Sequence, residues 1–227
     1  MDTRRRAVVV RDVQRLTPAY HRVVFEGEEL EGFASPGADD HIKIFWGEES
    51  REFTPAEVGE GRLAVDFVLH GAGLASTWAQ RARPGDGVVI GGPRGSLLVR
   101  GEPDWWLLAG DLTALPAIRR RAAEALPGTP VDVIVLADSP DDVQPVESPG
   151  DLRVRWVHPA AGAPSGDVTP LIDVLDALPP RAGHGFAFIA AEQSIVKPAR
   201  ELLDARGVPL EHSVVKGYWK RGSEAGH

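Results

Sequence analysis

Trp105-Trp106-Leu107-Leu108-Ala109-Gly110-Asp111 is the stretch that decides the fold of the C-terminal half of this chain. Its first five residues are apolar without interruption, which predicts a buried strand, and a helical pattern follows from Thr113 to Ala125. Continuous apolar strands are typical of parallel sheets, because helices cover both faces of such a sheet.

The same alternation of strand and helix continues to the C-terminal end. Further strands are expected at residues 131–137, 152–157, 186–191 and 210–219, with helices around 171–178 and at 194–206. Strands that alternate with helices indicate βαβ units with right-handed crossovers. Residues 101–227 are therefore expected to form a five-stranded parallel-sheet domain of the nucleotide-binding type.

The N-terminal half of the chain has a different pattern of expected strands and helices. Short strands are expected at residues 6–13, 20–25, 41–46, 62–70 and 87–90, separated by turn residues at intervals of about 8–12, and one helix is expected at 74–82. This spacing is typical of a small barrel or sandwich. Residues 1–100 are therefore expected to form an antiparallel β-barrel domain.

Composition excludes several classes of protein. The 227 residues include no cysteine, which rules out a disulfide framework, zinc ribbons, iron–sulfur clusters and thiol catalysis. A net charge of −8 argues against a nucleic-acid partner. The first residues contain no apolar run typical of a signal peptide, and no window holds 18 successive apolar residues, so we expect a cytoplasmic protein without a membrane partner.

Two segments have the form of a phosphate-binding turn. Gly71-Ala72-Gly73-Leu74-Ala75-Ser76 lies between an expected strand and an expected helix, where glycines let backbone amides approach a phosphate. A simple glycine turn, with Ser76 in the first turn of the helix, explains it equally well.

Gly110-Asp111 and Thr113 follow the first strand of the parallel sheet, where open sheets bind ligands. Asp111 or Thr113 as a plain helix N-cap is an equally good interpretation. Trp219 ends the last expected strand, where its ring could cover a ligand or simply pack.

No side chains indicate nucleophilic or metal chemistry. The seven histidines lack metal-ligand spacing, and the best cluster, His41 beside Asp39 and Asp40, is a weak one, so no metal site is expected. The sequence contains no Gly-x-Ser-x-Gly elbow and no Walker A loop. We nominate no catalytic residue and expect a bound cofactor to carry any chemistry.

Several phrases together resemble the siderophore-interacting protein family across nearly the whole chain. They are Leu16-Thr17-Pro18, Asp40-His41-Ile42-Lys43, Val65-Asp66-Phe67-Val68-Leu69-His70-Gly71, Ala75-Ser76-Thr77-Trp78-Ala79, Pro84-Gly85-Asp86, Gly92-Pro93-Arg94-Gly95, the run Leu107 to Ile118, and Gly217-Tyr218-Trp219. The resemblance implies a ferredoxin-reductase-like fold, with a flavin-binding β-barrel followed by a nicotinamide-binding α/β domain. It also implies an FAD-dependent ferric-siderophore reductase, with NAD(P)H or ferredoxin as electron donor.

The resemblance also implies particular site residues. Arg51, Phe53 and Thr54 match the phrase that lines the flavin, with Phe53 stacking on the ring and Arg51 meeting phosphate. The segment that holds the pyrophosphate is matched by His70, Gly71, Ala75 and Ser76, and the mouth that receives the nicotinamide nucleotide by Gly110, Asp111 and Thr113. The C-terminal region of the family is matched by Lys216, which is expected to contact the substrate, and by Trp219, which is expected to lie near the cofactor.

Four positions depart from the family pattern. Phe53 replaces a tyrosine, Ala56 an arginine, Leu74 a proline and Leu112 an acidic residue. Because lost charge-assisted contacts weaken phosphate binding, a second hypothesis stays open. In that alternative the scaffold has a weakened or lost flavin site, and it binds a small metabolite or catalyses a non-redox step.

Overall fold

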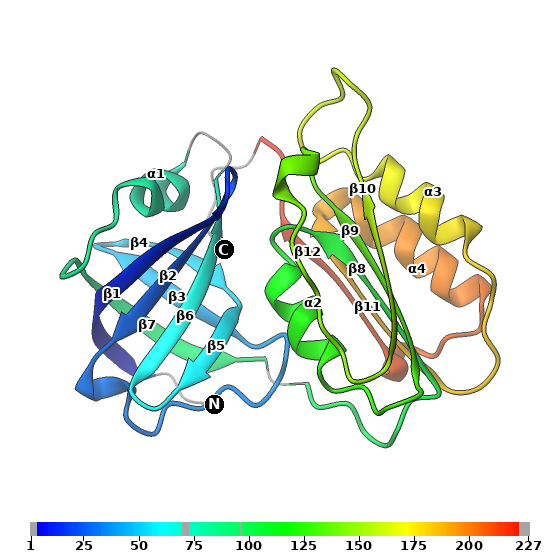
Figure 1. Cartoon of the computed structure of the whole chain (residues 1–227), viewed down its shortest axis with the longest axis horizontal. Coiled ribbons are helices and arrows are strands. Elements are labelled where there is room, and N and C mark those ends of the chain that lie inside the picture. The colour runs from blue at the N-terminus through cyan, green and yellow to red at the C-terminus, as the bar shows by residue number, and fades with distance from the viewer. Residues whose placement is uncertain (1–3, 70–72, 96, 223–227) are drawn as a thin grey trace. The chain divides into compact units, whose positions relative to one another are not determined.

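The computed structural model describes residues 4–69, 73–95 and 97–222. Contacts divide the chain into two compact units, with the division between Leu98 and Val99. Unit 1 holds a seven-stranded sheet and unit 2 a five-stranded sheet (Figure 1).

Unit 1 is an antiparallel sheet with one helix. Its elements are β1 (Arg5–Thr17), β2 (Tyr20–Glu26), β3 (His41–Trp46), β4 (Glu49–Phe53), β5 (Pro55–Gly59), β6 (Arg62–Val68), α1 (Leu74–Arg81) and β7 (Gly87–Arg94), with a 3₁₀ turn at Glu28–Leu30. The strand order is β4-β3-β7-β1-β2-β6-β5. Only Thr54 separates the two outermost strands, β4 and β5, in sequence, so the sheet must curl to bring its ends together, as a barrel does.

The core of unit 1 follows from alternation along its strands. Ile42 and Ile44 on β3 and Val65 and Phe67 on β6 are all buried in one apolar cluster. Residues between them on these strands point to the other side of the sheet, as the period of two requires.

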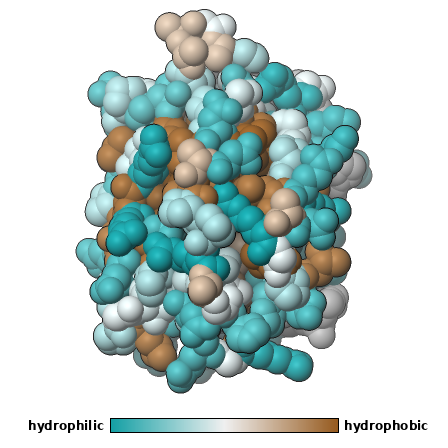
Figure 2. All heavy atoms as spheres, turned by 90° about the vertical axis from the view of Figure 1, so that its right-hand side faces the viewer, coloured by the Kyte–Doolittle hydropathy of each residue, from teal (hydrophilic) through white to brown (hydrophobic). Residues whose placement is uncertain are grey.

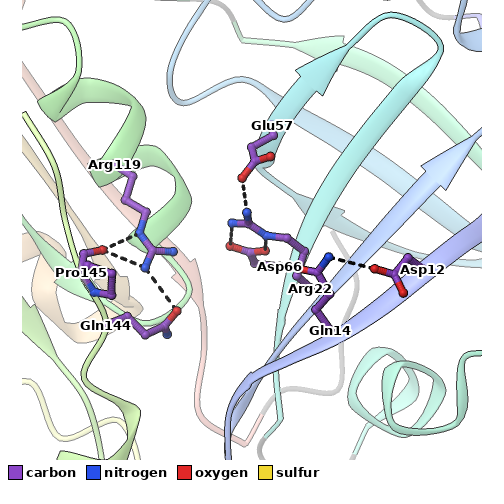
Figure 3. A network of polar contacts seen from close by, with 8 residues as sticks. All are labelled: Asp12, Gln14, Arg22, Glu57, Asp66, Arg119, Gln144 and Pro145. Atoms are coloured by element: carbon purple, nitrogen blue, oxygen red, sulfur yellow. Dashed lines mark hydrogen bonds and ion pairs between the residues drawn. The ribbon is translucent and has the colours of Figure 1, made fainter.

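A polar network joins three strands of unit 1. The Arg22 guanidinium donates from Nε to Asp66 Oδ1 at 2.7 Å and from Nη2 to Asp66 Oδ2 at 2.9 Å, and it also contacts Glu57 (Figure 3). Arg22 and Asp66 lie directly opposite each other on β2 and β6. The paired Asp66 carboxylate raises the pKa of Arg22, so the guanidinium stays charged.

Unit 2 is a parallel sheet covered by helices. Its elements are β8 (Trp105–Asp111), α2 (Leu115–Ala122), β9 (Pro130–Leu136), β10 (Asp151–Val157), α3 (Thr169–Ala177), β11 (Gly185–Glu192), α4 (Val196–Ala205) and β12 (Ser213–Trp219). Three 3₁₀ turns lie at Pro140–Asp142, Gln193–Ile195 and Leu210–His212. The strand order is β10-β9-β8-β11-β12, and Figure 1 shows α3 and α4 side by side on one face with α2 on the other.

Every residue of β8 and of β11 is buried, which explains their uninterrupted apolar runs. Leu107 and Ile189 face α3 and α4 in one cluster with Leu171 and Leu203. The face of unit 2 at the right of Figure 1 is mostly polar, with small apolar areas between polar side chains (Figure 2).

The predicted fold is confirmed: an antiparallel sheet precedes a five-stranded parallel sheet. Strands β4 and β5 were not expected, and the expected strand at 210–219 begins only at Ser213, because a 3₁₀ turn occupies Leu210–His212. Within the described residues, no helix is both long and apolar enough to cross a bilayer.

Candidate functional site

The carboxyl ends of β8 and β11 form the switch point of the unit 2 sheet. The chain runs outward from β8 in one direction through β9 and β10, and in the other through β11 and β12. Open α/β sheets bind ligands in the crevice beyond the strand ends at such a point. Asp111 ends β8, Glu192 ends β11 and Trp219 ends β12, so three polar or aromatic side chains gather there.

Asp111 and Trp219, both predicted site residues, are in direct contact. The Trp219 indole Nε1 donates to Asp111 Oδ2 at 2.7 Å, and the backbone N–H of Thr113 donates to Asp111 Oδ1 at 2.9 Å. Burial raises the pKa of Asp111, while the hydrogen bonds from Thr113 and Trp219 oppose that rise. The carboxylate therefore fixes the position of an aromatic ring 108 residues away in the chain.

Trp219 also packs closely against the loop before α3. A Cβ atom placed on Gly166 would lie 2.3 Å from Trp219 Cη2, so only glycine leaves room for the ring. Glu192, which the sequence did not single out, accepts the backbone N–H of Ser194 at 2.7 Å and that of Arg221 at 3.1 Å. The two carboxylates thus hold the end of β12 and the residues after it at the switch point.

The structure separates the roles predicted for Gly110, Asp111 and Thr113. A Cβ atom on Gly110 would lie 2.2 Å from the Ala190 carbonyl oxygen, so this glycine permits close approach of β11. Helix α2 has Ala114 as its N-cap, without a side-chain cap. The plain N-cap interpretation of Asp111 and Thr113 is therefore wrong; the Asp111 carboxylate closes a turn just before the helix.

Lys216, the predicted substrate contact, lies half-buried on β12. It lines a hollow of about 380 Å³ together with residues of α4 and of the segment before β12, including Arg200, Leu203 and Leu210. The hollow lies along the first half of β12, whereas Trp219 ends that strand. The structure therefore does not bring Lys216 to the Asp111–Trp219 pair.

In unit 1, Arg51 and Phe53 lie on the edge strand β4 and Thr54 follows it. Phe53 pairs with Ile42 and Arg51 with Ile44, so the two side chains share one side of the sheet. Arg51 Nη1 donates to the Ser50 carbonyl at 2.8 Å, and Nη2 lies 3.7 Å from Glu49. Thr54 is buried between β4 and β5.

Phe53 belongs to an aromatic cluster in unit 1. Its ring centroid lies 4.6 Å from that of Phe67 and 6.3 Å from that of Trp46, and Trp78 lies 5.5 Å from both Phe67 and Trp46. The Trp46 indole nitrogen is buried without a hydrogen-bond partner. The cluster thus combines stacking surfaces with one unused donor.

Ala75 and Ser76 lie in the first turn of α1, and His70 and Gly71 lie outside the described residues. The helix begins after Gly73, which has a φ of 91°, and no side chain caps it. Its first turn contains no acidic residue. Ser76 is buried and its Oγ accepts from Gln80 at 3.4 Å. The backbone N–H groups of this turn are therefore not engaged by a capping side chain.

Among the four departures from the family pattern, two are packing residues. Phe53 packs against the barrel core, and Leu112 is buried after β8. Leu74 is the first residue of α1, and Ala56 lies on the edge strand β5. Apolar side chains at these positions fit their surroundings.

A basic cavity on unit 1 was not predicted from the sequence. Arg5, His41, Lys43 and Arg94 line a cavity of about 120 Å³, whose remaining walls are Phe45, Gly91 and Gly92. The Arg5 guanidinium carbon lies 4.3 Å from the Phe45 ring centroid, a cation–π contact. On β3, His41 and Lys43 alternate with the buried Ile42 and Ile44. This alternation is the one feature of the sequence that pointed to basic side chains on the outer side of the strand.

Asp40, next to His41, accepts from Ser35 Oγ at 2.8 Å and from the Gly37 N–H at 3.1 Å. It therefore stabilises a loop. No group of three or more potential metal-ligating side chains occurs in the part of the chain that the structure describes.

Two family models match this chain. Residues 103–222 match the model described as siderophore-interacting protein. Residues 9–64 and 48–97 match the siderophore-interacting FAD-binding domain. The two matches fall on the two units of the structure.

Curated relatives include two reductases. An NADPH-dependent ferric-chelate reductase of Escherichia coli is 36% identical over 144 residues, covering 53% of this chain and 57% of that protein. Ferric vibriobactin reductase ViuB of Vibrio cholerae is 27% identical over 231 residues, covering 88% of this chain and 84% of that protein. The matched region thus spans less than two thirds of the E. coli relative.

Solved structures extend the comparison. A siderophore utilization protein from T. fusca superposes with a TM-score of 0.90 at 30% identity, covering 100% of this chain and 97% of that chain. Phthalate dioxygenase reductase has a TM-score of 0.72 at 12% identity, covering 97% of this chain and 70% of that chain. At that identity the second likeness shows the fold alone, which is that of the ferredoxin-reductase class.

Proposed function

This chain belongs to the siderophore-interacting protein family, and we propose that it is an FAD-dependent reductase of ferric iron held by a siderophore. The electrons come from a nicotinamide dinucleotide or from ferredoxin. The observation that carries the proposal is the Asp111–Trp219 pair at the switch point of unit 2, in a chain whose unit 1 matches an FAD-binding domain.

The residues of unit 1 fit FAD. The uncapped first turn of α1 offers backbone N–H groups and the positive end of a helix dipole, which suit a pyrophosphate. The proposed contacts from that turn are Ala75 and Ser76, with His70 and Gly71 before it. Arg51 supplies a guanidinium for phosphate, and Phe53 and Trp46 supply aromatic faces and the unused indole donor.

FAD, held by Arg51, Phe53 and the first turn of α1, would supply the redox chemistry that links a two-electron donor to the one-electron reduction of ferric iron. The chain itself binds and orients the reactants, and it excludes water from them. In unit 2, Asp111 holds Trp219 at the strand ends, and Gly110 lets β8 and β11 approach closely enough to form the crevice. No side chain is needed as an acid or base.

The basic cavity of unit 1 is the proposed contact for the substrate. Ferric complexes with hard-oxygen chelators often carry negative charge, which Arg5, Lys43 and Arg94 would attract. A volume of about 120 Å³ suits one anionic group of such a ligand and not a whole siderophore. Lys216 remains a proposed substrate contact on unit 2. The protein is proposed to act in the cytoplasm.

The test is the visible spectrum of the purified chain before and after addition of FAD. Flavin absorption that persists through gel filtration, and that bleaches anaerobically with reductant and returns with a ferric chelate, is the expected result. Arg51→Ala should weaken FAD binding by about ten- to a hundredfold, the effect of one charge-assisted contact. Arg62→Ala, an exposed arginine at the start of β6, is the matched control.

A colourless protein that takes up no FAD would instead favour a scaffold without a working flavin site. In that case Ala56→Arg and Phe53→Tyr, which restore the family residues, should produce a clear gain in FAD affinity. If neither substitution raises the affinity for FAD, Phe53 and Ala56 are neutral differences from the family pattern.

A further inference from the structure

We infer that the dinucleotide donor of this chain is NADH and that Asp138 selects it over NADPH. This inference rests on the proposed function, because it assigns a donor to the crevice of unit 2. NADPH differs from NADH only by a phosphate on the 2′-oxygen of the adenosine ribose. The choice therefore depends on the charge that the strand ends present to that ribose.

Asp138 lies at the carboxyl edge of the strand next to β8. β9 ends at Leu136, and Asp138 is the second residue after it, with an exposed side chain. Ser165 Oγ donates to Asp138 Oδ2 at 3.1 Å, which fixes the carboxylate toward the loop before α3. In dinucleotide-binding sheets of this strand order, a carboxylate near this edge accepts a hydrogen bond from the ribose 2′-hydroxyl, and an arginine accommodates a 2′-phosphate.

The loops that follow β9 and β10 contain no cationic residue that could receive a phosphate. Residues 122–152 and 156–180 include neither lysine nor arginine. The first of these loops instead carries Asp138, Asp141, Asp142 and Glu147. A 2′-phosphate, with nearly two negative charges at neutral pH, would be repelled there.

Arginines from elsewhere in unit 2 also approach these segments, and two of them lie near the strand ends, each with partners of its own. Arg119 on α2 donates from Nε and Nη2 to the Pro145 carbonyl, at 3.1 and 3.0 Å, and from Nη2 to Gln144 (Figure 3). Hydrogen bonds from Thr169 lower the pKa of Asp167, and hydrogen bonds from Ser194 lower that of Glu192 against the opposing effect of burial. Arg221 lies near both carboxylates and adds a smaller lowering to each pKa. Among the described residues, Asp138 forms its side-chain hydrogen bond with Ser165 and no ion pair with either arginine.

His158 is the one remaining group of basic type at the end of β10. Its Nδ1 lies 2.8 Å from the Ala137 carbonyl oxygen, which makes Nδ1 a donor to the backbone next to Asp138. That hydrogen bond holds the ring at the β9 strand end, beside the residue that carries the Asp138 carboxylate.

The first experiment measures binding without turnover. The purified 227-residue chain is titrated calorimetrically with 5′-AMP and with 2′,5′-ADP, which differ only in the 2′-phosphate. We expect 5′-AMP to bind about ten- to a hundredfold more tightly, the effect of losing one hydrogen bond to a charged group. Equal or tighter binding of 2′,5′-ADP would overturn the inference.

Variants assign the effect to one residue. Asp138→Asn should reduce the preference for 5′-AMP at least threefold, and Asp138→Arg should reverse it. Glu211→Gln removes an exposed carboxylate in the turn before β12, at the opposite edge of the sheet, and should change nothing. An unchanged preference in both Asp138 variants would refute the role of Asp138.

Anaerobic flavin reduction by NADH and by NADPH separates this inference from the proposed function. Faster reduction by NADH supports both. Faster reduction by NADPH overturns the inference and leaves the reductase proposal standing. If neither dinucleotide binds nor reduces bound flavin, the inference fails, and the proposed function survives only with a protein donor such as ferredoxin.

Discussion

Replacing Trp219 with phenylalanine tests the contact that defines the switch point. Trp219→Phe keeps a ring against Gly166 but removes the indole donor, which lies 2.7 Å from the buried Asp111 carboxylate. A hydrogen bond to a charged group contributes about 1.5–3 kcal/mol to stability. With an m-value of about 2 kcal/mol/M, the urea midpoint of unit 2 should fall by about 1 M.

The loss should depend on pH. Because the pKa of Asp111 in the folded chain is above its ordinary value of 3.8, the folded state binds its proton more tightly than the unfolded state does. The free energy of unfolding therefore falls as pH rises from about 3.8 to the raised pKa, and is constant above it. Without the indole donor that pKa rises further, so the deficit of Trp219→Phe should be larger at pH 8 than at pH 4.

Pulsed hydrogen exchange of peptides from β8 and β12, across a urea series, reports the unfolding of unit 2 alone. Trp156→Phe on β10, which β9 separates from β8, is the matched control and should show no comparable pH dependence. A midpoint shift in Trp219→Phe below 0.25 M at pH 8, or one that is the same at pH 4, would refute a stabilising bond between the indole and the carboxylate; 0.25 M corresponds to about 0.5 kcal/mol.

Three further outcomes are expected. Gly110→Ala would place a Cβ 2.2 Å from the Ala190 carbonyl oxygen, and the overpacking should cost about 1–3 kcal/mol in urea unfolding of unit 2; wild-type stability would contradict this. Arg22→Leu should destabilise unit 1 by about 3–5 kcal/mol, because it leaves the buried Asp66 carboxylate without its partner. The double variant with Asp66→Leu should recover most of that loss, and failure to recover would show that packing dominates. Lys43→Gln should raise the KM for an anionic ferric chelate several-fold in steady-state assays at low salt, with a smaller effect at high salt, whereas a salt-independent change would count against an electrostatic role.

The fold was largely predictable because its core strands are long and apolar. The runs that became β8 and β11 are buried on every residue, so burial and sequence pattern agree. The strands that escaped prediction lie at the two ends of the unit 1 sheet: β4 includes three charged residues among five, and β5 begins with a proline. Edge strands tolerate both features, since one side of an edge strand has no partner strand.

The candidate site was predictable only in part. Its position at the end of the first strand of the parallel sheet was enough to single out Asp111, but its partner Trp219 lies on a strand that is distant in sequence. The helical pattern placed the start of α2 too early, because the turn that Asp111 closes delays the helix to Leu115. The basic cavity collects side chains from β1, β3 and β7, so the alternation on β3 alone was not enough to predict it.

The ion pair between Arg22 and Asp66 has a consequence for folding. The two residues face each other across β2 and β6, and a shift of one position would place Arg22 opposite Val65 or Phe67 instead. Such a slip would also turn the apolar side chains of one strand toward the opposite face, so it costs both burial and charge pairing. The pair therefore specifies a unique alignment of the two strands, and with it the alignment of β5, whose Glu57 contacts the same guanidinium.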